Sequence, residues 1–194
     1  MPKVYIKTLG CKVNTYDTRA IENQFISKGY AIVDQPHLSD VNVINSCSVT
    51  NAAEKEARYL LRRYHRENPG ALRVITGCYA QTQSARLATL EEVDCVVPNE
   101  VKSELIAFVS KALNQSHEER QLSGKLPEGI NQVKDNRQGH FKSSAVFFDK
   151  AKSDSRTRSF LKIQDGCNGF CSYCLIPYAR GLAQVSIRSK LSTR

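Results

Sequence analysis

The sequence lacks any apolar run near the roughly 18–20 residues that a membrane-spanning helix needs. It also lacks the features of a secretory signal, because its amino terminus, MPKVYIKTLGC, has a charge at Lys7 and no small-residue cleavage site. These two absences argue against a membrane protein and a secreted protein. They predict a cytoplasmic protein without a membrane partner.

Cysteine, by contrast, is plentiful, with seven among 194 residues. Cytosolic thiols are kept reduced, so this number favours metal binding or catalysis over disulfides. The apolar content of 41% and the charged content of 24% are typical of a globular protein. The length allows one full domain and a fragment of another.

Positive charge is concentrated at the end of the chain. Residues 142–194 hold ten Lys or Arg against three Asp, so they carry +7 of the net charge of +9. Such a basic end favours a polyanionic partner such as nucleic acid. A solvated basic tail is an equally good interpretation of charge alone.

Short apolar runs alternate with amphipathic stretches through the first 113 residues. The predicted strands are Val4–Thr8, Ala31–Val33, Val41–Asn45, Leu72–Thr76 and Val93–Val97, and the predicted helices are 15–28, 51–67, 81–90 and 101–113. This alternation indicates βαβ units and an α/β fold. We expect a five-stranded, flavodoxin-like parallel sheet with strand order 2-1-3-4-5.

The chain divides into three parts by composition. Residues 1–113 form the α/β domain, the polar stretch 114–157 is a linker, and residues 158–194 begin a second domain. That last part opens with a strand-like run at Phe160–Ile163, which leads into Asp165-Gly166-Cys167.

Three cysteines each follow the end of a predicted strand, in KTLGC, VINSC and VITGC: Cys11, Cys47 and Cys78. Parallel strands end at one edge, and strands one, three and four are neighbours about 4.8 Å apart. Three thiols at that edge favour a metal cluster over buried structural thiols. A dinucleotide site is disfavoured, because GxGxxG is missing. Cys95 begins its strand instead and is predicted to be structural.

A second set occupies CNGFCSYC, where Cys167, Cys171 and Cys174 have the spacing C-x3-C-x2-C. Three close thiolates suit an iron–sulfur cluster with one iron left open. Structural zinc takes four protein ligands, and no His or fourth Cys lies nearby. The sequence therefore predicts two iron–sulfur sites.

Four segments in order resemble the tRNA methylthiotransferases, a family of radical S-adenosylmethionine enzymes. They are TLGCKVNTYD (8–17), NSCSVTNAAEKEAR (45–58), VITGCYAQ (74–81) and FLKIQDGCNGFCSYCLIPYARG (160–181). GCKVN and CSVTNAAEKEAR are most similar to the branch that acts on N6-threonylcarbamoyladenosine.

The resemblance implies two [4Fe-4S] clusters. Cys167, Cys171 and Cys174 would hold one whose open iron binds S-adenosyl-L-methionine, and its electron would release the 5′-deoxyadenosyl radical. Cys11, Cys47 and Cys78 would hold the other, which would supply the methylthio group to the adenine C2 beside the anticodon. Tyr173 would lie by the adenine of the cofactor, or else pack under the loop. No catalytic residue is implied beyond the cluster ligands.

The resemblance also implies partners, namely the tRNA anticodon stem-loop and an electron donor, while the oligomeric state stays unknown. In the family the second motif opens a (β/α) barrel followed by a small RNA-binding β domain. Here only 13 residues follow Gly181, and LAQVSIRSKLSTR does not resemble the family. We therefore expect a truncated, incomplete barrel and an inactive fragment. The alternative is a non-catalytic iron–sulfur or RNA-binding module.

Overall fold

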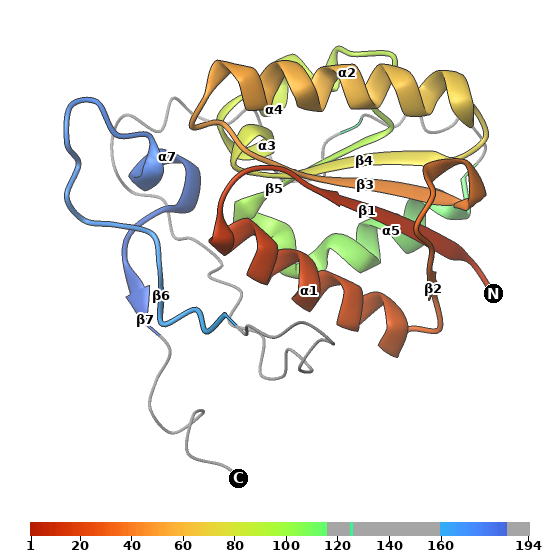
Figure 1. Ribbon diagram of the computed structural model, residues 1–194, viewed down its shortest axis with the longest axis horizontal. Helices are drawn as coiled ribbons and strands as arrows, with labels where there is room; N and C mark the ends of the chain where they lie inside the picture. The colour runs from red at the N-terminus through yellow and green to blue at the C-terminus, as the bar shows by residue number, and fades with distance from the viewer. Residues whose placement is uncertain (116–124, 126–159, 186–194) are drawn as a thin grey trace, which may run out of the picture.

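The computed structural model describes residues 1–115, 125 and 160–185. A five-stranded parallel sheet forms its centre, with helices on both faces (Figure 1). The strands are β1 (Lys3–Thr8), β2 (Ala31–Ile32), β3 (Val41–Ser46), β4 (Leu72–Gly77) and β5 (Cys95–Pro98). Their order is β2-β1-β3-β4-β5, which confirms the predicted α/β fold and its strand order.

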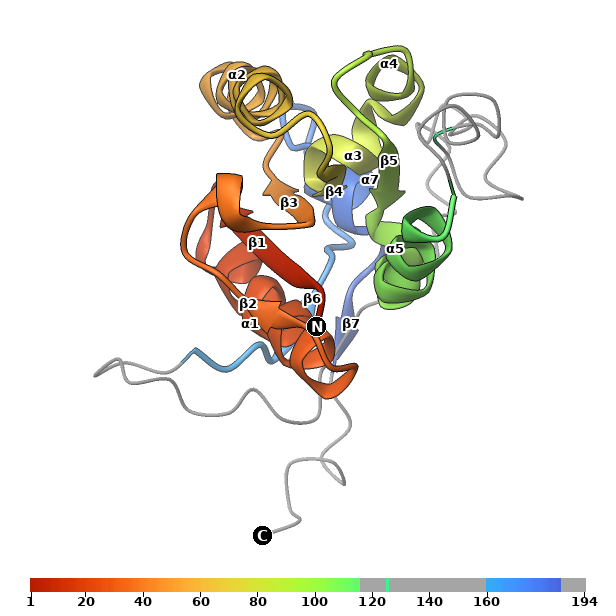
Figure 2. The same ribbon diagram turned by 90° about the vertical axis from the view of Figure 1, so that its right-hand side faces the viewer.

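The longer helices divide between the two faces of the sheet (Figure 2). Helices α1 (Lys12–Ser27) and α5 (Leu105–Leu113) bury Ile21, Phe25 and Val109 in one core. Helix α2 (Asn51–Glu67) and the short α4 (Ser84–Ala88) bury Leu60, Leu61 and Leu87 in the other. Strands β3 and β4 are buried along their whole length, as a parallel sheet covered on both faces requires.

The other described helices are short. They are η1 (Pro36–Leu38), α3 (Cys78–Thr82), η2 (Asn99–Glu104) and α7 (Ile176–Arg180). The single helix predicted at 81–90 is wrong in its bounds. Helix α3 begins directly after β4, and Gln83, at φ −135° and ψ 33°, separates it from α4.

The second part of the chain departs from the expected strand at Phe160–Ile163. The strand is instead β6 (Gln164–Asp165), which pairs antiparallel with β7 (Gln184–Val185). Phe160 is held by side chains, because the charges of Lys12 and Arg19 on α1 each lie 5.8 Å from its ring centre. The run therefore lies along α1 without joining a sheet.

The linker predicted at 114–157 falls almost wholly outside the described residues. Lys125 is one of its described residues. The Lys125 backbone oxygen accepts a hydrogen bond from the backbone N–H of Val96 at 2.8 Å, which covers part of the outer edge of β5. Within the described ranges, no helix is long and apolar enough to cross a membrane.

Candidate functional site

The first three cysteines stand at the carboxyl edge of the sheet, as the sequence predicts. Cys11 directly precedes α1, Cys47 directly follows β3, and Cys78 is the first residue of α3 after β4. Strands β1, β3 and β4 are adjacent. Cys47 and Cys78 are buried, whereas Cys11 is exposed. The edge thus carries two sheltered thiols and one that faces solvent.

Two glycines permit this close packing of the strand ends. A Cβ on Gly10, at φ +98°, would lie 2.7 Å from the Cys47 sulfur. A Cβ on Gly77, at φ +95°, would lie 2.4 Å from the backbone oxygen of Ser46. The Cys47 side chain therefore lies against the backbone that leads into Cys11, and β4 turns tightly into Cys78.

Cys78 lies in a polar, positively charged setting. Burial raises the pKa of its thiol, while the nearby charges of Arg180 and Lys102 act in the opposite direction. The side-chain amide of Asn99 donates to its sulfur at 3.9 Å. The cations offset only part of the effect of burial, so the neutral thiol is favoured until a metal binds the thiolate.

Within the described residues, no group of three His, Cys, Asp or Glu side chains is close enough to hold a single metal ion. A [4Fe-4S] cluster is wider than an ion and takes cysteinate sulfur. In the described part of the chain, the buried Ser48 hydroxyl next to Cys47 has no hydrogen-bond partner. Three thiols on neighbouring strand ends and an unpartnered buried hydroxyl fit a cluster bound by three cysteines.

The second cysteine set forms a loop between β6 and α7. A Cβ placed on Gly169 would lie 3.4 Å from the Cys167 sulfur and 3.7 Å from the Cys171 sulfur. The Gly169 N–H donates to the Cys167 sulfur at 3.4 Å. The Cys174 N–H donates to the Cys171 backbone oxygen at 2.9 Å. The loop therefore turns two of its sulfurs toward one glycine.

The two ends of this loop are joined to each other. The Cys167 N–H donates to the Gly181 oxygen at 3.1 Å. Gly166, at φ +74°, allows the chain to pass so close that a Cβ there would lie 2.3 Å from the Leu182 oxygen. The loop is thus a closed unit rather than an open extension.

The remaining sequence candidates are Tyr173 and Cys95. Tyr173 is 91% exposed, so it does not pack under the loop, and its predicted place beside the cofactor stays a prediction. Cys95 begins β5 and is buried in the core, where burial raises the pKa of its thiol to about 12. It is a structural thiol, as expected.

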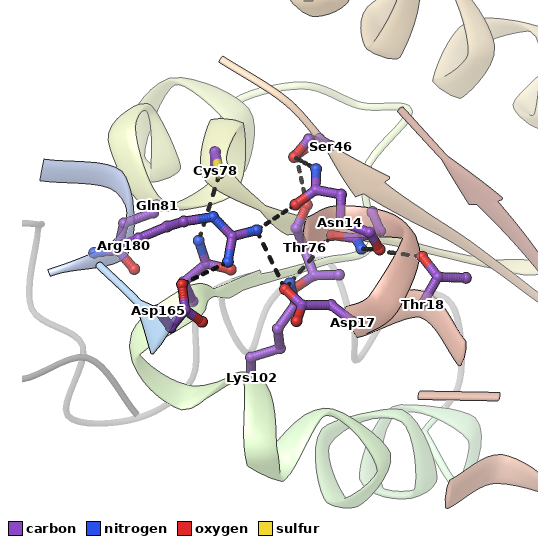
Figure 3. A network of polar contacts seen from close by, with 12 residues as sticks. Asn14, Asp17, Thr18, Ser46, Thr76, Cys78, Gln81, Lys102, Asp165 and Arg180 are labelled. Atoms are coloured by element: carbon purple, nitrogen blue, oxygen red, sulfur yellow. Dashed lines mark hydrogen bonds and ion pairs between the residues drawn. The ribbon is translucent and has the colours of Figure 1, made fainter. Parts of the chain in front are cut away.

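A buried polar network joins the two cysteine regions (Figure 3). Its members, which sequence reasoning did not single out, are Asn14, Asp17, Asn99, Lys102, Lys162, Asp165 and Arg180. Several of them lie inside the quoted motifs, Asp17 in TLGCKVNTYD and Arg180 in the segment that ends YARG. Nothing local in either segment indicates that these charges are buried or that they meet.

Comparisons with known proteins identify the family of this chain. The model of the "Uncharacterized protein family UPF0004" matches residues 3–98, which contain the whole sheet. The threonylcarbamoyladenosine tRNA methylthiotransferase MtaB of Aquifex aeolicus is 41% identical over 180 residues, or 92% of this chain. The chain belongs to the tRNA methylthiotransferase family. The MtaB of Bacillus subtilis is 40% identical over 94% of the chain.

The MtaB of Thermotoga maritima is 32% identical over 98% of the chain. That alignment extends past Gly181, where we expected the resemblance to end. The chain spans about two fifths of these relatives: 40% of the first, 37% of the second and 38% of the third.

Proposed function

We propose that this chain is the cluster-binding portion of a tRNA methylthiotransferase that modifies N6-threonylcarbamoyladenosine next to the anticodon. The placement of three cysteines on adjacent strand ends carries this proposal, together with the glycines that let those strand ends meet. The names of the relatives support the reaction class and the modified base.

Each cysteine set has its own part in the proposal. Cys11, Cys47 and Cys78 would hold the [4Fe-4S] cluster that supplies the methylthio group. Cys167, Cys171 and Cys174 would hold the second [4Fe-4S] cluster, and three thiolates leave one of its irons for S-adenosyl-L-methionine. When bound, these groups supply the radical and sulfur chemistry that side chains lack.

The residues of the chain itself would shelter the clusters, position the cofactor and balance the charge of the thiolates. Burial of Cys47 and Cys78 shields two of the three thiols of the first site from water, and the cations near Cys78 offset the negative charge of bound thiolates. The exposed Tyr173 ring stands on the second loop, where it would lie beside the adenine of the cofactor. The tRNA anticodon stem-loop, an electron donor and a cytoplasmic location belong to the same proposal.

Residues 158–194 would form the start of a radical-SAM barrel, and the isolated chain is expected to leave tRNA unmodified. The direct test is a chimera, in which this chain replaces the matching segment of the Bacillus subtilis relative. The chimera should form the 2-methylthio nucleoside on tRNA that carries threonylcarbamoyladenosine. Its Cys78→Ala variant should form none, because only two ligands of the first site would remain.

Two outcomes would count against this proposal. An inactive chimera that keeps the iron of both sites would favour the non-catalytic iron–sulfur or RNA-binding module. Methylthio product from the isolated chain would refute the expectation that it is inactive. Nucleoside mass spectrometry of digested tRNA measures the methylthio product, and iron analysis of the chimera measures its clusters.

A further inference from the structure

Asp17 on α1 lies at the centre of a buried ionic cluster (Figure 3). Its two carboxylate oxygens contact Lys162 at 2.8 Å and both Lys102 and Arg180 at 3.2 Å. Asp165 contacts the same Lys162 at 2.9 Å and the same Arg180 at 2.8 Å. We call these five residues the Asp17 clasp. Each of their side chains is at most 7% exposed.

The clasp joins the two parts of the chain. Asp17 and Lys102 belong to the sheet domain, whereas Lys162, Asp165 and Arg180 belong to residues 160–185. Lys162 and Asp165 come before the second cysteine loop, and Arg180 comes after it. Both ends of that loop are therefore held at the same carboxylate.

Two asparagines extend these contacts to the first cysteine set. The Asn14 amide donates to the backbone oxygens of Leu9 at 2.8 Å and Ser46 at 2.9 Å, close to Cys11 and Cys47. Its side-chain oxygen accepts from Arg180.

The Asn99 amide donates to the Ala179 oxygen at 2.7 Å and to the Cys78 sulfur. Through Ala179 and Arg180, helix α7 is therefore hydrogen-bonded to two side chains that lie next to the three cysteines of the first set.

Few apolar side chains of this segment are fully buried. Leu161, Ile163 and Val185 are each about two thirds exposed. Among the described residues of the segment, Pro177 and Ala179 of α7 are buried, and Phe160, Leu175 and Ile176 are half-buried. Burying five charged groups is costly, and such networks favour one defined geometry more than they add stability.

We propose that the Asp17 clasp fixes the second cysteine loop against the first cysteine set, with Asp17 and Arg180 as positioning residues. The docking is inferred from contacts between residues of this chain alone. Its consequence, a constant distance between the two clusters, rests on the function proposed above. The clasp and the clusters are therefore tested separately.

The clasp is tested by limited trypsin digestion of the full chain. Asp17→Asn and Asp165→Asn remove the ion pairs but keep every Lys and Arg, so all cleavage sites remain. Cleavage after Lys162 and Arg180 should accelerate on the order of tenfold or more, because a broken buried pair leaves charges uncompensated. Asp165 lies outside the sheet domain, so its variant tests the clasp even if Asp17→Asn fails to fold.

The matched control is Asp94→Asn, which removes the partner of the fully buried Arg73 within the sheet domain. Its cleavage after Lys162 and Arg180 should equal that of the wild type. Unchanged cleavage in both clasp variants would overturn the proposal, as would equal acceleration in the control.

The consequence for the clusters has a spectroscopic test. In chain reconstituted anaerobically with iron and sulfide and then reduced, the electron paramagnetic resonance signals of the two clusters should show mutual coupling. Asp17→Asn should weaken that coupling at unchanged iron content, while Asp94→Asn keeps it. Identical spectra at full iron content would overturn the positioning role. Wild-type chain without iron would refute the cluster assignment and leave the digestion to decide on the clasp.

Discussion

Gly77 shows how a single residue shapes the first cysteine site. Its backbone, at φ +95° and ψ −164°, lies in a region that only glycine adopts readily. Gly77→Ala should lower the free energy of unfolding by about 2–4 kcal/mol, since strain adds to a clash with the Ser46 oxygen. Urea unfolding followed by circular dichroism measures the loss. Gly29→Ala is the control, because its φ is also positive but no atom lies within 4 Å of an added Cβ. Equal losses in the two variants would contradict the close approach.

Asp17 gives the structure a defined pH dependence. Burial alone would raise the pKa of Asp17, but the surrounding cations Lys102, Arg180 and Lys162 outweigh it and hold that pKa well below its usual range. A lowered folded-state pKa contributes stability above the unfolded value, near pH 4, and this stability is lost as pH falls below it.

Thermal unfolding between pH 7 and pH 3 measures this contribution. The stability advantage of wild type over Asp17→Asn should be constant near neutral pH and shrink below about pH 4. An advantage that stays constant down to pH 3 would show that the carboxylate charge is not what stabilises the clasp.

At the scale of elements, helix α2 is stabilised by the residue that precedes it. Thr50 precedes the helix in an extended conformation, and its hydroxyl accepts from the Ala53 N–H at 3.2 Å. Thr50→Ala should cost about 1 kcal/mol of unfolding free energy, whereas Thr50→Ser should cost much less. Chemical unfolding compares the two. An equal cost would mean that packing of the threonine methyl, rather than the cap, is what matters.

The elements also show how far sequence reasoning reaches. Short apolar runs that alternate with turns and helical stretches were enough to predict the five strands of the parallel sheet. Because parallel strands end at the same edge, this prediction also placed Cys11, Cys47 and Cys78 on one edge. The break at Gln83 was missed because periodicity does not register a single non-helical residue. Helix α7 has only five residues, fewer than a periodic pattern needs.

The clasp lies beyond such reasoning for a different reason. Asp17 and Arg180 are 163 positions apart, and nothing local in either segment indicates that they meet. The strand expected at Phe160–Ile163 fails similarly, because contacts of Phe160 with α1 decide its path. Local patterns predict elements, whereas long-range ionic contacts decide how the second segment docks.

At the scale of the whole molecule, two cysteine regions are held at one end of a parallel sheet. In Figure 1 the segment that carries the second set lies beyond the same strand ends that carry the first. We propose that both regions bind iron and sulfide independently of each other.

Iron and acid-labile sulfide per chain after anaerobic reconstitution test that claim most directly. Two [4Fe-4S] clusters give about eight irons in the wild type and in the Cys95→Ala control, whose thiol is structural. Replacing Cys167, Cys171 and Cys174 together by alanine should leave about four irons, and so should replacing Cys11, Cys47 and Cys78. Either triple variant with the full wild-type iron content would contradict the account.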